Sequence, residues 1–318
     1  MASSVETIHT KEVEDELQAP RKYDVLYVNL LLAIYVHIAA LYGVYFAFTS
    51  GTWNTLIFHI MISQLVTLGT TAGRHRLWSH KSYKAKMPLQ ILLLVLNSMS
   101  FQYSVIHWAR DHRLHHRYCD TDADPHNASR GFFFSHFGWL IVRRHPEVLR
   151  RGKAIDISDV LSNPMLRFEN KYAVPIGVTF TLVLPTLIAM YFFGESLNTA
   201  WHINMTRYVC NLHLAFSTNS IVHLWGSRTY DKNLSGAQST FLSIFTWGEA
   251  YHNYHHTFPL DYRTAELGNN WLNPTTKVID FFAWLGWAYD LKTVPVDVAQ
   301  FRASRTGDGS NIWGFKTE

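Results

Sequence analysis

The chain has 318 residues, of which 48% are apolar and 15% aromatic, and its net charge at pH 7 is only +4. A charge this small, without a run of Lys or Arg, argues against nucleic acid as a partner. The two cysteines, Cys119 and Cys210, exclude a disulfide framework and a Cys-x-x-Cys metal site. The mean hydropathy is near zero, as expected when apolar blocks alternate with polar ones.

The first two apolar blocks predict a transmembrane hairpin over residues 23–73. Residues 1–22 before it are polar and acidic and do not resemble a cleavable signal peptide. Val25–Phe48 carries no formal charge and exceeds the ~20 residues that span a bilayer. Six residues then lead to a second apolar run, Thr55–Gly73.

The middle segment, residues 74–171, contains two weaker apolar stretches. Met87–Val105 includes several polar residues and predicts a buried or interfacial helix. Gly131–Val142 is aromatic but too short to span a bilayer. Beyond it, Ala173–Phe193 and Met205–Leu224 predict two further spans, which would form a second hairpin over residues 172–226.

The distribution of basic residues predicts the orientation of these spans. The connection between the last two, residues 194–204, carries no Lys or Arg, whereas residues 74–171 carry 16. By the positive-inside rule, both termini and the middle segment lie in the cytosol. We therefore predict an all-α integral membrane protein with four transmembrane helices in two hairpins. One cytosolic helical cap would be formed by residues 74–171 and 227–318.

Two histidine triplets share the spacing His-x-x-His-His. They are His112, His115 and His116 in one, and His252, His255 and His256 in the other. On a helix, spacings of three and four place side chains on one face, and neutral imidazole suits iron, copper or zinc. Chance would produce this pattern about 0.06 times in so His-rich a chain. Two copies therefore favour metal ligation over surface histidine clusters.

Further candidates lie at the cytosolic ends of predicted spans. His75 and His80 are five residues apart, a spacing that suits His75 in the last turn of a helix and His80 just beyond it. Asn219 and His223 are four residues apart at the end of the last span. Polar residues there are costly unless they face a partner. An interhelical hydrogen bond is the alternative interpretation of this pair.

Together these segments supply nine imidazoles, which suit two metal ions with coordination positions left open. Nitrogen ligation without thiolates suits iron that activates O2, although ligand type alone also allows zinc. Glu249 and Asp111 stand beside the two triplets. We expect these carboxylates to orient imidazole N–H groups.

Eight sequence motifs extend from the histidine segments to most of the chain: HRLWSHKSYKA, WARDHRLHH, DADPHN, RGFFFSHFGWL, HLWGSRTYDKN, HNYHHTFPLDYRTAE, GWAYDLK and RTGDG. In these motifs, from Tyr27 to about Gly309, the chain resembles the membrane-bound fatty acyl-CoA desaturases of the stearoyl-CoA, delta-9 type, and most of all their insect members. The resemblance implies four transmembrane helices, a cytosolic cap and a di-iron centre with nine histidine ligands. It also implies a place in the endoplasmic reticulum membrane, with electrons from cytochrome b5 and NADH-cytochrome b5 reductase.

Matched by motif, the resemblance implies one iron at His75, His80, His112, His116 and His255. It implies a second at His115, His223, His252 and His256, with Asn219 holding a metal-bound water. The acyl-CoA head group would be held by Asn29, Arg110, Asp111, Arg143 and Arg144. Arginine is a good phosphate donor, although anionic lipid is an alternative partner for Arg143 and Arg144.

Four positions depart from the family's pattern. Tyr103 replaces an Asn that meets the substrate, and Phe216 replaces a tunnel Trp. Arg74 replaces a small residue before the first histidine, and His107 replaces an acidic residue. We expect these departures to change tunnel length, bend or head-group grip without touching the metal ligands.

No haem-binding His-Pro-Gly-Gly stretch occurs, so we expect no fused haem domain and a separate electron donor. We predict an acyl-CoA desaturase that uses O2 and two electrons to introduce a cis double bond, at carbon nine, into long-chain saturated acyl-CoA. The alternatives are a desaturase with a shifted double-bond position, a fatty acyl hydroxylase, and a non-catalytic desaturase-like membrane protein that binds metal or lipid.

Overall fold

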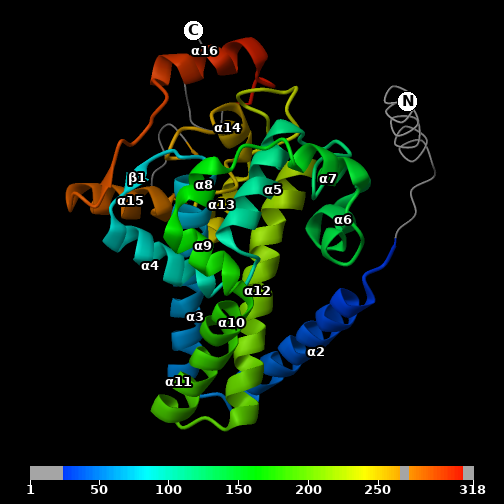
Figure 1. Cartoon of the computed structure of the whole chain (residues 1–318), viewed down its shortest axis with the longest axis vertical. Coiled ribbons are helices and arrows are strands. Elements are labelled where there is room, and N and C mark those ends of the chain that lie inside the picture. The colour runs from blue at the N-terminus through cyan, green and yellow to red at the C-terminus, as the bar shows by residue number, and fades with distance from the viewer. Residues whose placement is uncertain (1–23, 266–271, 311–318) are drawn as a thin grey trace, which may run out of the picture.

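The computed structural model describes residues 24–265 and 272–310, so the polar segment predicted at residues 1–22 lies outside the described residues. Helices form a narrow stem with a wider cap above it (Figure 1). One small antiparallel sheet, β1 (Lys84–Ala85) with β2 (Ala288–Tyr289), is the sole sheet in the described part of the chain. The predicted helical fold is therefore confirmed.

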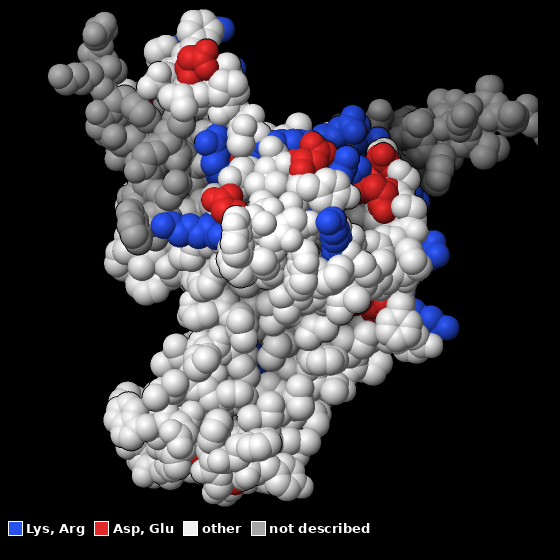
Figure 2. Space-filling view, turned by 90° about the vertical axis from the view of Figure 1, so that its left-hand side faces the viewer, with Lys and Arg blue, Asp and Glu red and all other residues white. Residues whose placement is uncertain are grey.

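The stem contains three stretches long and apolar enough to cross a membrane. They are α2 (Tyr27–Thr49), then α3 (Trp53–Leu68) continued by the π-helix η1 (Gly69–Ser79), and finally α10 (Ala173–Gly177), η4 (Val178–Val183) and α11 (Leu184–Phe193) in series. Figure 2 shows that Lys, Arg, Asp and Glu gather on the cap and nearly vanish from the stem. Exposed apolar side chains such as Leu41 and Tyr191 give the stem a surface that suits lipid.

The fourth predicted span corresponds to α12 (Leu197–Leu224), which packs along α2, α3 and α11. At 28 residues it is long enough to span a bilayer, but its composition is too polar to count among the apolar helices. Several of its polar residues are buried, among them Arg207, which donates to the Thr181 carbonyl oxygen over 2.7 Å. The four-span topology and its orientation therefore stay predictions.

The predicted connection over residues 194–204 is wrong, because α12 begins at Leu197 rather than Met205. Gly194 ends α11 in the left-handed conformation, at φ 73°. Ser196 then caps α12, since its side chain accepts a hydrogen bond from the Thr199 N–H. These two local signals shorten the connection to three residues.

The π-helix explains the five-residue spacing of the first histidine pair. In a π-helix, hydrogen bonds join residues five apart, and here the His80 N–H donates to the His75 carbonyl oxygen over 3.1 Å. His75 thus lies in the last turn, and His80 just beyond it, as predicted. The two imidazole rings are 4.8 Å apart between centroids.

The cap is built from short helices whose core lies where η1 meets α4 and α5. In chain order they are α4 (Met87–Ser98), α5 (Val105–Arg117), η2 (Ala128–Arg130), α6 (Phe132–His136), η3 (Gly138–Leu140), α7 (Pro146–Gly152), α8 (Ser158–Ser162), α9 (Pro164–Lys171), α13 (Thr240–Thr246), α14 (His252–Thr257), α15 (Pro274–Trp284) and α16 (Val296–Thr306). Leu89, Leu93 and Val105 are among the fully buried core residues.

The predicted single helix over Met87–Val105 is wrong, because a loop over residues 99–104 separates α4 from α5. Phe101 and Tyr103 in this loop have positive φ angles of 45° and 64°. Such angles are strained for residues other than glycine and persist only where surrounding contacts hold them. The aromatic stretch Gly131–Val142 lies in the cap, as α6 and η3.

Gly69 lies where the stem helix crosses α4, and it offers a test of this packing. A Cβ at this position would lie 2.4 Å from Asn97 N and 2.5 Å from Leu96 C, which are backbone atoms. We expect Gly69→Ala to destabilise the protein by about 1–3 kcal/mol through overpacking, measured by thermal unfolding in detergent. Gly152→Ala is the control, because its nearest neighbour would be 3.6 Å away. Equal melting of the two variants would contradict this packing.

Glu169 of α9 joins that helix to the start of α5. It is 4% exposed, and its Oε2 accepts a hydrogen bond from Val105 N over 3.1 Å. Burial raises the pKa of Glu169 from 4.5 to about 7. A raised carboxyl pKa means that the folded state binds the proton more tightly than the unfolded state does. The contribution to stability is therefore greatest below pH 4.5 and is lost as the pH rises to 7.

Glu169→Gln keeps an acceptor for Val105 N and removes the buried charge. We expect the variant to be more stable than the original chain at pH 8, by up to roughly 3 kcal/mol. The difference should shrink towards zero near pH 5, where the original carboxyl is protonated. Thermal melts across this pH range measure the effect, and parallel stability curves for the two proteins would refute it.

Candidate metal centre

Four elements that are far apart in the sequence bring nine imidazoles together where the stem meets the cap. They are η1, α5, α12 and α14, and both histidine triplets lie on helices as predicted. The ligand atoms form two groups, within each of which they lie within 4.8 Å of one another. The groups are His75, His80, His112, His116 and His255, and His115, His223, His252 and His256. These are the two sets that the sequence resemblance implies.

The Nε2 atoms of these residues are closely spaced. His75 and His255 are 3.0 Å apart, His255 and His116 are 2.9 Å apart, and His80 and His112 are 2.7 Å apart, all between Nε2 atoms. In the second group, the Nε2 atom of His252 lies 2.9 Å from that of His223 and 3.0 Å from that of His256. Each group thus gathers nitrogen atoms around a shared point.

Carboxylates hold the opposite side of three of these rings. Glu249 Oε2 lies 2.6 Å from His75 Nδ1, Asp124 Oδ2 lies 2.8 Å from His115 Nδ1, and Asp120 Oδ2 lies 2.9 Å from His223 Nδ1. A carboxylate accepts the Nδ1–H of a neutral imidazole and so leaves Nε2 with a lone pair. Lone pairs that face each other at about 3 Å repel unless a cation lies between them. The donor set therefore fits metal ions.

Burial favours the neutral, metal-binding form at five of the six triplet imidazoles. It lowers the pKa well below the usual value at His112 and His116 on α5, and at His252, His255 and His256 on α14. Neighbouring imidazoles act in the same direction, because two positive charges cannot share so small a space. Neutral imidazole is the form that binds a metal ion.

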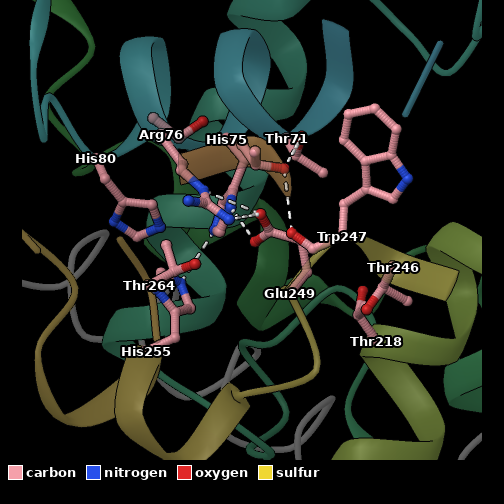
Figure 3. Close-up of polar contacts among 12 residues, drawn as sticks. Thr71, His75, Arg76, His80, Thr218, Thr246, Trp247, Glu249, His255 and Thr264 are labelled. Carbon is pink, nitrogen blue, oxygen red and sulfur yellow. Dashed lines mark hydrogen bonds and ion pairs between the residues drawn. The ribbon is translucent and has the colours of Figure 1, made fainter. Parts of the chain in front are cut away.

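Arg76 is the side chain that fixes Glu249 in place (Figure 3). It is fully buried, and its Nη2 and Nε donate to Glu249 Oε1 over 2.6 and 3.0 Å. Its Nη1 donates to the Tyr262 carbonyl oxygen and to Thr276. Burial alone would raise the pKa of Glu249, but Arg76 and His75 outweigh it and hold the pKa below its usual value. Glu249 therefore stays a carboxylate and orients an imidazole, as predicted, although that imidazole belongs to His75 and not to the neighbouring triplet.

The prediction that Asp111 also orients an imidazole of the metal centre is wrong. Its carboxylate binds Arg110 over 2.8 Å and Arg144 over 2.6 Å instead.

Sequence reasoning missed Asp120, Asp124 and Arg76 in the surroundings of the centre. The two aspartates lie four and eight residues beyond His116, the last histidine of its triplet. This closeness in sequence is the signal that could have identified them. Arg76 lies between His75 and His80, where its role depends on contacts that spacing does not reveal.

A cavity of about 570 Å³ lies against the centre, within the roughly 300–1,000 Å³ typical of small-molecule sites. Four of the nine imidazoles line it: His75, His112, His115 and His252. Asn219 lines it as well, one turn before His223. Phe216 is buried in the wall, 5.8 Å from the ring of Trp139 between centroids.

One predicted head-group residue, Asp111, lines this cavity. Tyr103 and His107, two of the positions that depart from the family's pattern, line it as well, and their rings stack 4.9 Å apart. Asp111 holds Arg110 and Arg144 beside them. Asn29 and Arg143 lie apart from this cluster. Asn29 donates to the Leu140 carbonyl oxygen over 2.8 Å, and the largely exposed Arg143 approaches Asp24 to 3.4 Å.

Asp120→Asn tests whether the carboxylates tune metal binding. The amide can still accept from Ala128 N, but its N–H groups would face His223 Nδ1 and favour the tautomer that cannot ligate through Nε2. We expect metal affinity to fall about 10- to 100-fold, measured as bound iron at limiting iron supply. Asp297→Asn, an exposed position on α16, is the control. Equal iron content in both variants would refute this role for Asp120.

Comparison with known proteins identifies the family. Residues 50–271 match the model of the fatty acid desaturase family. The chain is 56% identical to an acyl-CoA Delta(11) desaturase of Spodoptera littoralis, over 99% of this chain and 96% of that one. It is 48% identical to an acyl-CoA Delta-9 desaturase of Acheta domesticus (93% and 83%) and 44% identical to stearoyl-CoA desaturase 5 of Homo sapiens (91% and 88%). With its histidine-lined cavity, the chain belongs to the fatty acid desaturase family.

Proposed function

We propose that this protein is an O2-dependent desaturase of long-chain acyl-CoA that forms a cis double bond. The observation that carries the proposal is that nine imidazoles converge in two groups and that four of them line a cavity, whose wall also includes Asp111, the partner of Arg110 and Arg144. The reaction removes two hydrogens from adjacent methylenes and reduces O2 to two water molecules. Its balance requires two electrons and two protons from outside.

Two iron ions are the proposed metals, one at each imidazole group, with Asn219 acting on the second through a water molecule. Nitrogen ligands without thiolates support iron over softer metals. Bound iron would supply O2 activation and the removal of hydrogen from an unactivated chain. The nine histidines of the two groups would hold it, and Glu249, Asp124 and Asp120 would keep the rings of His75, His115 and His223 oriented.

The remaining residues would bind and position the substrate. We assign the CoA phosphates to Arg110 and Arg144, whose guanidinium groups suit phosphate oxygens. Asn29 and Arg143, which contact Leu140 and Asp24 instead, stay predicted head-group residues without this support. Burial alone would raise the pKa of Asp111, but His107 and Arg144 outweigh it, so the carboxylate stays charged and holds Arg144. The cavity walls would exclude water and present one pair of methylenes to the centre, with Tyr103 and Phe216 shaping the path.

We propose the endoplasmic reticulum membrane as the location, with cytochrome b5 and its NADH-dependent reductase as electron donors. In this arrangement four helices span the bilayer, and both termini and the metal centre face the cytosol. Sixteen Lys and Arg residues in the segment 74–171, against none at residues 194–204, support this orientation. The residues from 23 to 318 would act as one catalytic unit.

For the position of the double bond, we propose carbon 11 over the carbon 9 expected from the sequence resemblance. The chain is 56% identical to a Delta(11) desaturase and 48% identical to a Delta-9 desaturase. Carbon 9 stays the second candidate. The position of the double bond depends on how the cavity places the acyl chain, and residues such as Arg74 and Tyr103 line that cavity.

Expression in a yeast that lacks its own desaturase tests this function. We expect a new monounsaturated fatty acid, and the location of its double bond by mass spectrometry decides between carbon 11 and carbon 9. His256→Ala is the control, because it removes one proposed ligand and should abolish the product.

Each other outcome has a distinct meaning. A hydroxylated fatty acid would identify the protein as a hydroxylase. No product from a folded, iron-loaded protein, across several chain lengths and with cytochrome b5 present, would favour a non-catalytic metal- or lipid-binding protein. A product that persists in His256→Ala would refute the ligand assignment.

A further inference from the structure

Arg74 places a buried positive charge in the wall of the cavity. The residue is 0% exposed, lines the cavity and directly precedes His75 in η1. A saturated hydrocarbon chain offers no partner to a guanidinium group. Burying a charged donor against such a chain is costly unless its hydrogens are satisfied elsewhere.

Two of the guanidinium nitrogens are satisfied by one residue. Arg74 Nη1 donates to the Gln102 carbonyl oxygen over 3.1 Å, and Nη2 donates to Gln102 Oε1 over 2.9 Å. Gln102 lies in the strained loop between α4 and α5, flanked by the positive φ angles of Phe101 and Tyr103. These contacts fix the outer edge of the guanidinium group.

The third nitrogen, Nε, is buried and has no hydrogen-bond partner within the described residues. No ion pair between Arg74 and a carboxylate is formed in that part of the chain either, and the nearby Glu169 is engaged with Val105 N. One face of the guanidinium group is covered by Trp108, at 4.7 Å from the ring centroid. Arg74 therefore brings to the cavity wall a buried N–H that has no partner among the described residues.

The ring contacts fix the depth of this donor. Trp108 stacks on His112, with centroids 4.5 Å apart and an angle of 14°, and its edge meets His75. Arg74 is thus linked through Trp108 to two members of the first histidine group, His75 and His112. A group that accepts its hydrogen bond would be part of the acyl chain, close to the methylenes that react.

We propose that Arg74 makes this protein selective for acyl-CoA whose chain carries a hydrogen-bond-accepting oxygen, such as a hydroxyl group, level with the metal centre. This proposal rests on the acyl-CoA function proposed above and narrows its substrate class. Sites built to hydrogen-bond a substrate group discriminate strongly against analogues that lack it, because their buried polar atoms then stay unpaired.

Binding measurements on the full-length protein in detergent test the proposal. The probes are hexadecanoyl-CoA and a series of hydroxyhexadecanoyl-CoA thioesters in which the hydroxyl moves along the chain. We expect one mid-chain isomer to bind about tenfold more tightly than the saturated thioester, as a charged hydrogen bond would give. Arg74→Met, which keeps most of the volume, should remove that preference. Arg150→Met, at an exposed position of α7, should retain it.

Arg74→Lys decides the case if Arg74→Met does not fold, because Lys keeps the charge but has no N–H at the Nε position. Loss of the preference in the Lys variant supports the proposal, and an unchanged preference refutes it. Equal binding of the saturated and hydroxylated thioesters by the original chain also refutes it. The proposal is also refuted if Arg74→Met lowers the affinity for every thioester by the same factor, since that result would place the contact at the part that all thioesters share.

These outcomes are separable from failure of the proposed function. If no CoA thioester binds and the yeast assay yields no product, the acyl-CoA function itself is wrong. If hexadecanoyl-CoA is desaturated and binds as tightly as every hydroxyhexadecanoyl-CoA, only the proposed role of Arg74 is refuted.

Discussion

The structure depends on one electrostatic constraint: nine largely buried imidazoles bring ring nitrogens together in two groups. Nitrogen atoms 2.7–3.0 Å apart are stable only if cations lie among them or hydrogens are shared between them. The carboxylates of Glu249, Asp124 and Asp120 hold hydrogens on the outer nitrogens. The surroundings of the centre are therefore built to favour metal ions.

This constraint extends outward through further contacts. Glu249 can act as a buried carboxylate because Arg76 neutralises it, and Arg76 is itself saturated by backbone and side-chain oxygens. A buried pair of this kind is destabilised strongly when one partner is lost. The residues around the centre thus form one connected set, in which each charge has its partner and each ring has its orientation.

The sequence predicted most of the elements whose signal is local. The two triplets lie on α5 and α14 because spacings of three and four fit a helix, and the long apolar runs became α2, α3 and the helices α10 to α11. The start of α12 was not predicted correctly, because the apolar run begins only at Met205 whereas the N-cap at Ser196 starts the helix at Leu197. The loop over residues 99–104 was missed because its conformation depends on distant contacts, among them Arg74 with Gln102.

For the site, the residue types and spacing predicted which histidines gather but not what surrounds them. Asp111 was assigned to the imidazoles because it precedes His112, yet a helix turns successive residues about 100° apart, and so it faces Arg144. Glu249 lies just before α14 and orients His75 of η1, so its partner comes from a segment far away in the sequence. Contacts such as Arg76 with Asn273 join residues nearly two hundred positions apart and leave no trace in spacing.

The continuity of α3 and η1 has a mechanical consequence. These two segments form a single helical rod of 27 residues, from Trp53 to Ser79, so the apolar surface of the stem and His75 belong to one rigid body. Metal sites require their ligands within about 0.5 Å of the productive geometry. Any change in the tilt of this rod, including one imposed by bilayer thickness, therefore displaces His75 relative to the ligands on α14. The thickness of the surrounding membrane becomes part of the geometry of the centre.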